Sequence, residues 1–311
     1  MARKTDNPPD DAITPLSTGR WLRLDTRDSD WLARLEAGLD IRLDERHRED
    51  CENQQHPPFY EETEDYELLI LRASSGLSPG EVPATRSFAL ILTEADVATV
   101  CAGPQTEIES LGRRIGSGRS RPPDNLAVAY MVMNRLVDRF LGMREPMSGQ
   151  VDDWQDRLLD GGKQFEDWSE LMSVRRHLKR LEISFESQLD AFLEWRDETR
   201  FEIGKTLRIR LNDLEEHMIR LVRHVQSLQH DIDSLVQIYF SAASQRTNEV
   251  VRLLTVVSVI FLPLHLIVGY FGMNFARMPF TDVGAGAWLV ALVMLGLGVG
   301  LLIVFKRKGW F

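Results

Sequence analysis

The residues of this chain whose types suggest chemistry lie in and beside its two most apolar segments. No Asp, Glu, Lys or Arg occurs from Leu253 to Phe271 or from Val283 to Phe305, and the short gap between them contains Gly272-Met273-Asn274. At 1.5 Å per residue, each segment is long enough to cross a hydrocarbon core of about 30 Å as a helix. Two such helices cannot enclose a path alone, so a path along them would need several copies of the chain.

Polar side chains in the first apolar segment share one face of the expected helix. This face advances in steps of three or four residues: Asn248, Val251, Leu254, Ser258, Leu262 and His265. It carries every Asn, Ser and His between residues 248 and 271. Polar groups at membrane depth are tolerated mainly where they meet water or protein. The pattern therefore predicts a water-facing surface, on which Leu254 and Leu262 would form constrictions that close by dewetting.

A plainer interpretation of that face remains open. Ser258 and the neighbouring Thr255 could donate only to the backbone of their own helix, as hydroxyls inside helices often do.

The charge of the chain is unevenly distributed. Six of the 37 basic residues and two of the 47 acidic residues lie after residue 245, so the first 245 residues carry a net charge of −14. This acidic part argues against nucleic acid as a partner, because phosphates require a basic footprint. Cys51 and Cys101 are isolated and not in a metal-binding spacing, so we expect reduced cytosolic thiols.

The basic residues near the apolar segments predict an orientation. Arg246 and Arg252 precede the first segment, and the cluster 306–308 follows the second. By the positive-inside bias, both ends lie in the cytoplasm and residues 272 to 282 face outward, which suits a multi-pass protein of the cell (inner) membrane. The polar, Pro-rich start, Met1 to Pro15, has no apolar core of a signal peptide.

The region before residue 122 mixes strand and helix signals. Strand-like runs occur at Trp21–Leu24, Tyr66–Arg72, Ser87–Leu92 and Val97–Cys101. Helices are expected after Asp28-Ser29-Asp30 as far as Leu39, and from Pro104 to Ile115. From Asp124 the pattern becomes helical: an apolar stripe runs from Leu126 to Phe140, and a polar helix is expected from about Phe165 to Trp195.

A heptad pattern of about five repeats follows. Its positions alternate steps of four and three: Leu207, Leu211, Leu214, Met218, Leu221, Val225, Leu228, Ile232, Leu235 and Tyr239. The pattern continues into the first apolar segment, which predicts one helix from about Lys205 to Tyr270. Because the polar helix could cover only part of this seam, self-association of the stalk is the expected way to bury the remainder.

At this point the residues resemble a known family. Several short runs are similar to the CorA-type divalent-cation transporters: Asn248-Glu249-Val250, the run from Leu254 to Leu264, Gly269, Phe271-Gly272-Met273-Asn274-Phe275 and Met278-Pro279. The specific match covers roughly Ser241 to Phe280. The resemblance implies an α+β cytosolic domain, a long stalk helix and two C-terminal transmembrane helices in a homopentameric funnel.

This resemblance implies a division of the chain into seven parts. They are a cytosolic α/β domain at 1–121, a helical part of that domain at 122–204, the stalk at 205–252, a pore-lining transmembrane helix at 253–271, an outer loop at 272–282, a second transmembrane helix at 283–305 and a basic cytosolic tail at 306–311.

Asn274 suits the recognition of a hydrated ion. Mg²⁺ dehydrates reluctantly, and a ring of carboxamide oxygens accepts hydrogen bonds from its waters without removing them. The resemblance implies that Gly272, Met273 and Asn274 form the selectivity filter, with the Asn ring closing the outer mouth. Gly272 would let the chain turn where a Cβ would clash. The alternative is a helix-ending glycine followed by an ordinary turn asparagine.

The identity of the ion stays open. His265 occupies a position that is usually a small polar residue in CorA-type proteins, and imidazole suits Zn²⁺, Co²⁺ or Ni²⁺ better than Mg²⁺. The outer loop has Ala276 and Phe280 where acidic residues often flank Met-Pro, which weakens the concentration of cations at the mouth. Mg²⁺ is placed slightly ahead of the transition metals; His265 could equally be a neutral packing residue.

Cytosolic regulation is implied more loosely. Asp213 falls where the family has a stalk Asp that helps to hold a regulatory cation between subunits, although its partner acid cannot be identified. The alternative is that Asp213 belongs to the solvated side of the stalk. His217, His224 and His230 have spacings of seven and six, which do not form one compact helical metal site, so a solvated face is expected for them as well.

No enzyme and no resident cofactor are expected. The sequence has no P-loop, no Gly-x-Gly-x-x-Gly opening a helix, no His-Glu-x-x-His and no Gly-x-Ser-x-Gly. The expected partners are membrane lipid, four further copies of the chain and divalent cations. The rival hypothesis is a membrane-anchored coiled-coil scaffold or metal sensor without transport.

Overall fold

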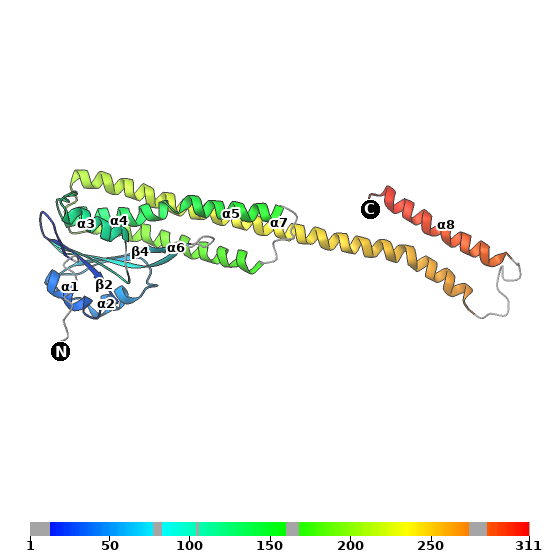
Figure 1. The fold of residues 1–311 in the computed structure, drawn as a ribbon, viewed down its shortest axis with the longest axis horizontal. Helices are drawn as coiled ribbons and strands as arrows, with labels where there is room; N and C mark the ends of the chain where they lie inside the picture. The colour runs from blue at the N-terminus through cyan, green and yellow to red at the C-terminus, as the bar shows by residue number, and fades with distance from the viewer. Residues whose placement is uncertain (1–12, 77–82, 104–105, 160–167, 274–284, 311) are drawn as a thin grey trace, which may run out of the picture. The chain divides into compact units, whose positions relative to one another are not determined.

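The computed structural model describes residues 13–76, 83–103, 106–159, 168–273 and 285–310 (Figure 1). The chain divides into two compact units, Met1–Leu235 and Val236–Phe311. Asn274 and the rest of the outer loop through residue 284 lie outside the described residues.

The first unit is built on one six-stranded mixed sheet. Its strands are β1 (Ile13–Pro15), β2 (Arg20–Asp25), β3 (Phe59–Glu62), β4 (Glu67–Gly76), β5 (Ala84–Leu92) and β6 (Val97–Cys101). Their order is β1-β2-β6-β5-β4-β3, and β2 and β6 are parallel while the other neighbours are antiparallel. Arg20 at the start of β2 is held by Asp96 just before β6, with Nη2 donating to Oδ2 at 2.8 Å.

Helices cover both faces of this sheet. Helices α1 (Trp31–Leu39) and α2 (Glu45–Glu52) contact β2, β5 and β6, whereas α4 (Asn125–Leu141) and α6 (Trp168–Glu198) lie on the opposite face (Figure 1). Helix α3 (Thr106–Gly116) packs beside β1 and α4. Because both faces are covered, the central strands are apolar at consecutive positions, and the run Leu68 to Leu71 is buried throughout.

The most apolar strands were predicted correctly and the short polar elements were not. Strand β6 coincides with the predicted run, and β2, β4 and β5 contain theirs except for Tyr66, which lies just before β4. Helix α2 was missed because six of its eight residues are charged and only His47 and Cys51 are buried. Strands β1 and β3, of three and four residues, are too short to show a period.

The long helix α7 (Lys205–Phe271) is continuous over 67 residues, as the sequence predicted. Within the first unit its heptad positions are covered by helices of the same chain, and those from Leu211 to Leu235 are at most 3% exposed. Helix α6 runs antiparallel to it: Arg175 pairs with Asp233 at 2.7 Å and Arg196 with Glu215 at 2.5 Å.

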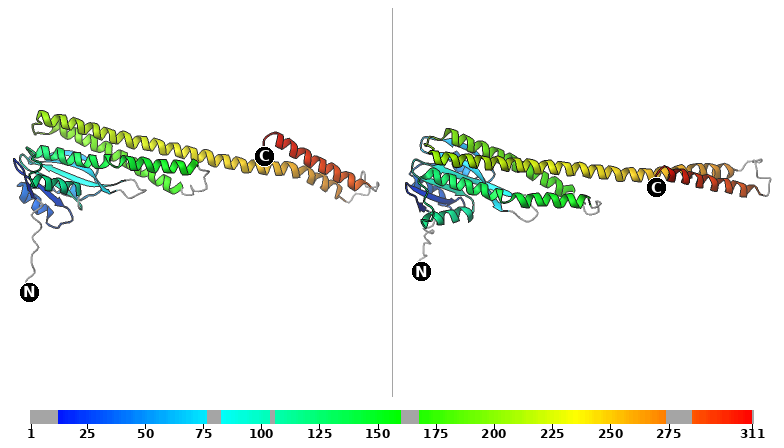
Figure 2. Two further views of the ribbon diagram at one scale, coloured as in Figure 1. Left: turned by 45° about the horizontal axis from the view of Figure 1, so that its top comes forward. Right: turned by 90° about the horizontal axis from the view of Figure 1, so that it is seen from above.

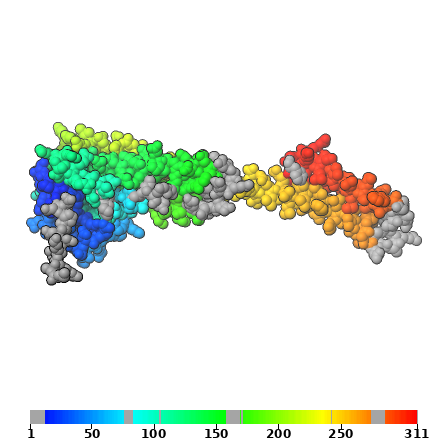
Figure 3. Space-filling view, in the orientation of Figure 1, coloured from blue at the N-terminus to red at the C-terminus, as the bar shows by residue number. Residues whose placement is uncertain are grey.

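Helices α4 and α5 (Arg144–Leu159) run parallel to α7 on another side. The guanidinium of Arg210 lies 5.9 Å from the ring centroid of Tyr130 in α4, and Arg144 at the start of α5 lies near His224. Figure 2 shows both flanking segments along α7, and in Figure 3 the green α4–α5 segment covers much of this part of it. From Leu211 to Leu235, helices of the same chain therefore bury the seam, so these positions do not need the self-association that was expected to cover them; Leu207 and Tyr239 at its ends are only partly buried.

A buried carboxylate joins the sheet to the end of α6. Glu67 at the start of β4 is fully buried and accepts hydrogen bonds from Trp195 Nε1 at 3.2 Å, Thr199 Oγ1 at 3.0 Å and the backbone N–H of Arg200 at 3.0 Å. Burial raises the pKa of Glu67, and the hydrogen bonds from Arg200 and Thr199 oppose that shift. These bonds fix the point at which the chain turns from α6 toward α7.

We expect Glu67→Ala to destabilise the first unit by about 3 kcal/mol, because several buried donors lose their acceptor at once. Urea unfolding of the full-length protein in detergent, followed by tryptophan fluorescence, measures this change. Glu64→Ala removes an exposed carboxylate from the same turn and serves as the control. Equal unfolding midpoints for the two variants would contradict the role given to Glu67.

Candidate functional site

The second unit contains the end of α7 and helix α8 (Gly286–Arg307). Both helices are long and apolar enough to cross a membrane, judged by length and composition. Only 6% of the most apolar window of each helix is buried within the chain. Helices of a soluble core would be mostly buried, so lipid or further protein must cover these surfaces.

One face of α7 packs against α8. Val256 on α7 is 2% exposed, and Phe305 on α8 is 9% exposed. A Cβ on Gly298 of α8 would lie 3.9 Å from Leu264 Cδ1, which is ordinary van der Waals contact. Val256, Ile260, Leu264 and Ile267 follow one another at helical spacing, and all four are at least partly buried.

Aromatic and cationic side chains connect the far ends of this helix pair. The guanidinium carbon of Arg252 lies 5.9 Å from the ring centroid of Trp310, and the rings of Trp310 and Phe305 are 5.3 Å apart. A cation over an aromatic face is stabilised by the ring quadrupole. In the sequence Arg252 is recognisable only as a flanking charge, and its pairing with Trp310 was not predicted.

The predicted polar face of α7 lies on the side away from α8. Counting 100° per residue, it is centred roughly half a turn from the Val256 face. Asn248 and His265 are exposed and Ser258 is partly buried, while Leu254 and Leu262 are 66% and 68% exposed. Within one chain most of this face is exposed, although it carries the Asn, Ser and His of the segment.

The plainer interpretation holds for Thr255 at the edge of that face. Its Oγ1 donates to the carbonyl oxygen of Val251 at 2.7 Å, so this hydroxyl is satisfied by its own helix.

The end of α7 has little room for a side chain. The N–H of Gly272 donates to the carbonyl oxygen of Val268 at 2.8 Å, and a Cβ on Gly272 would lie 3.0 Å from that oxygen. Met273 follows in the turn and is half exposed. Glycine permits this close approach of backbone to backbone, while Asn274 is outside the described residues.

The predicted regulatory residue stands in the first unit. Asp213 is exposed on α7, on the part of the helix that passes Tyr130. Burial raises the pKa of Tyr130, and the negative charge of Asp213 acts in the same direction. Among the described residues, no group of three or more His, Cys, Asp or Glu could hold a metal ion.

The expectation of a solvated histidine face was wrong for two of the three residues. His217 Nδ1 and His224 Nε2 are buried without a hydrogen-bond partner, whereas His230 is exposed. Burial lowers the pKa of His224, and the charge of Arg144 lowers it further. Both histidine side chains are partly buried, and they lie on the side of α7 that faces α4 and α5.

Comparison with known proteins places these features in a family. The family model described as "CorA-like Mg2+ transporter protein" matches residues 17–307. The cobalt/magnesium transport protein CorA of Thermotoga maritima is 27% identical over 186 residues, which is 58% of this chain and 51% of that protein. The match therefore spans about half the length of this relative.

Two further matches involve Methanocaldococcus jannaschii. Its cobalt/magnesium transport protein CorA is 22% identical over 261 residues, covering 83% of this chain and 81% of that protein. The complete structure of the CorA magnesium transporter from this organism superposes with a TM-score of 0.82 at 20% identity, covering 94% of this chain and 92% of the other. At this identity the superposition shows a shared fold: an α+β unit, a long helix and two C-terminal apolar helices.

Proposed function

Because this chain belongs to the family of CorA-like Mg²⁺ transporter proteins, we propose that it conducts divalent metal cations across a membrane through a pore formed by several copies of the chain. In this proposal residues 253–271 and 283–305 cross the membrane of the cell. Residues 272–282 face outward and both termini are cytoplasmic, following the distribution of basic residues.

The polar face of α7 carries the proposal. Asn248, Ser258 and His265 lie on the side that α8 leaves open. In lipid such groups would cost free energy unless they met water or protein. Copies of α7 arranged around one axis would turn this face toward a shared water-filled path, with α8 behind it on the lipid side. An anchor without a pore has no need of such a face.

The proposal also specifies the outer filter, the number of copies and the constrictions of the pore. We assign the outer filter to Gly272, Met273 and Asn274, with the Asn carboxamides reading the hydration shell of the ion. Five copies are proposed from the family resemblance. Leu254 and Leu262 would provide apolar constrictions between the polar positions, where dewetting interrupts conduction.

The ion and its regulation are proposed on separate grounds. Relatives named as cobalt/magnesium transport proteins favour Mg²⁺ and Co²⁺, while an imidazole at His265 favours Co²⁺, Ni²⁺ or Zn²⁺. Asp213 is proposed as one ligand of a regulatory cation held between neighbouring copies. Cations bridging such carboxylates would favour a closed state, and their loss would release it.

The main alternative is a membrane-anchored scaffold or metal sensor that conducts nothing. The two proposals are separated by metal uptake into vesicles that contain the purified protein, since only a pore gives flux.

We expect vesicles with the parent protein to take up divalent metal, and Asn274→Ala to reduce the initial rate at least tenfold, because the outer mouth loses its hydrogen-bond acceptors. A metal-sensitive dye inside the vesicles measures uptake of Mg²⁺ and Co²⁺. Asn212→Ala, at an exposed position of the first unit, is the control and should retain the parent rate. Absence of flux for every divalent ion in the parent protein would favour the scaffold.

Cysteine crosslinking tests whether the polar face of α7 lies at a shared axis. We expect mild oxidation of Ser258→Cys to give crosslinked dimers, because copies of this face would approach one another. Val256→Cys, which points toward α8, should stay uncrosslinked. The native thiols give little background, since Cys51 and Cys101 are 2% and 5% exposed and burial raises the pKa of Cys51 to about 12. Denaturing gels report the products; crosslinking at position 256 alone would reverse the assignment of the two faces.

Replacement of the pore histidine tests ion choice. We expect His265→Thr to shift preference toward Mg²⁺, since a hydroxyl interacts with the hydration shell whereas imidazole favours transition metals. Competition of Mg²⁺, Co²⁺, Ni²⁺ and Zn²⁺ in the vesicle assay measures the change, with His230→Thr as a control outside the pore. An unchanged ion profile would assign His265 to packing.

A further inference from the structure

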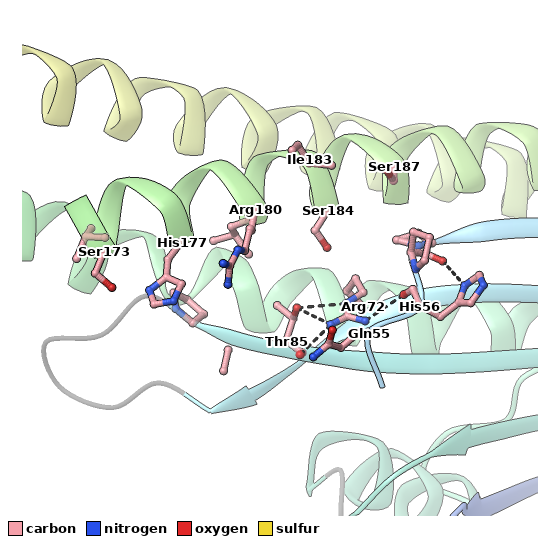
Figure 4. Close-up of a pocket in the computed structure, with 16 residues that line it drawn as sticks. Gln55, His56, Arg72, Thr85, Ser173, His177, Arg180, Ile183, Ser184 and Ser187 are labelled. Atoms are coloured by element: carbon pink, nitrogen blue, oxygen red, sulfur yellow. Dashed lines mark hydrogen bonds between the residues drawn. The ribbon is translucent and has the colours of Figure 1, made fainter. Parts of the chain in front are cut away.

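A pocket in the first unit, apart from the α7 face, has a lining unlike the rest of that unit. It has a volume of about 1030 Å³ and lies between α6 and the strands β4 and β5 (Figure 4). Among the residues that the structure describes, none of those lining the pocket is Asp or Glu, although residues 1 to 245 together carry a net charge of −14. Its charged or ionisable members are Arg72, Arg180, His56 and His177.

One wall of the pocket is a polar stripe on α6. Its members advance in steps of four and three along the helix: Ser173, His177, Arg180, Ser184 and Ser187. Figure 4 shows Arg180 and Ser184 extending from α6 toward Arg72 and Thr85. Within the described part of the chain, no hydrogen bond or ion pair occupies the side chains of this stripe. Several donors therefore converge on the pocket without a partner.

The opposite wall contains a buried cation. Arg72 is 7% exposed, and its guanidinium donates to the carbonyl oxygens of Thr85 at 2.8 Å, Gln54 at 2.9 Å and His56 at 3.1 Å. These acceptors are neutral, and no carboxylate of the described residues lies within ion-pair distance of Arg72. Burial lowers the pKa of Arg72, as expected for a charge with only dipoles around it.

Two described carboxylates close in sequence to lining residues already have partners. Asp50 pairs with Nε2 of His56 at 3.2 Å, and Glu182 pairs with Nζ of Lys179 at 2.6 Å and accepts from Gln229. Neither lines the pocket. In the part of the chain that the structure describes, no acid inside the pocket balances the positive charge of Arg72 and Arg180, and an anion entering it would be attracted by both groups.

We propose that this pocket binds a phosphate group of a small soluble anion. Phosphate combines charge with oxygens that point in several directions, so it can accept from the guanidinium of Arg180 together with the neighbouring ring of His177 or hydroxyl of Ser184. A carboxylate has only two coplanar oxygens and would leave donors unused. Pockets for small ligands enclose about 300–1,000 Å³, so the volume accommodates a phosphate alone or one carried by a nucleoside.

Equilibrium dialysis of the full-length protein in detergent tests the proposal. The probes are radiolabelled inorganic phosphate and AMP, in buffer without divalent cations so that ion transport does not contribute. We expect saturable binding, and Arg180→Gln to weaken it roughly tenfold, because a charge-assisted hydrogen bond is lost. Ser184→Ala should weaken it less, because it removes a neutral donor.

The matched control is Arg176→Gln. Arg176 is exposed on the same helix, carries the same charge and does not line the pocket. The Arg176→Gln variant should bind both probes within about twofold of the parent protein. Nonspecific attraction to the basic residues of α6 would instead weaken binding equally in the Arg176→Gln and Arg180→Gln variants. Tighter binding of AMP than of phosphate would identify a nucleoside phosphate, and equal binding would identify the phosphate group alone. No saturable binding of either probe, or equal weakening by the two arginine substitutions, would overturn the proposal.

Discussion

The structure depends on how one helix is covered along its length. Helix α7 carries apolar residues at heptad spacing in the first unit and polar residues on one face of its apolar segment in the second. In the first unit, α4, α5 and α6 bury the heptad positions from Leu211 to Leu235. In the second unit, α8 covers one face only. The uncovered polar face is what makes a lone copy unsuited to a membrane.

The two units differ in where their charged side chains lie and in what those side chains pair with. The first unit is acidic, but its acidic side chains are largely on the surface or paired with arginine, as in the pairs of Asp96 with Arg20 and Asp233 with Arg175. The described residues that line the pocket beneath α6 include no acid, and they include the buried Arg72. In the second unit, Arg252 stacks on Trp310 and so joins a flanking charge to the tail. Local surroundings, rather than the net charge of −10, therefore decide which ions each region attracts.

Much of the fold and part of the candidate site could be predicted because the signals are periodic. The continuous α7, the apolar strands β4 to β6 and the shared face of Asn248, Ser258 and His265 follow from spacing alone. Helix α2 could not be predicted, because its charged sequence is stabilised by the burial of His47 and Cys51 against the sheet. Sequence also could not pair Arg252 with Trp310, since their contact depends on how α7 and α8 pack.

The sequence by itself determined which segments are apolar enough for a membrane, which residues share a helical face and which family the chain resembles, because composition and period are local properties. Only the tertiary structure decided what covers each face. A heptad pattern predicts that its apolar residues are covered by another helix but does not identify that helix. Here the covering helices are α4, α5 and α6 of the same chain. The phosphate pocket likewise required the fold, because Arg72 and Arg180 are 108 residues apart and meet only where α6 crosses the sheet. Packing brings together in space residues that are far apart in the sequence, and no local sequence pattern encodes such a contact.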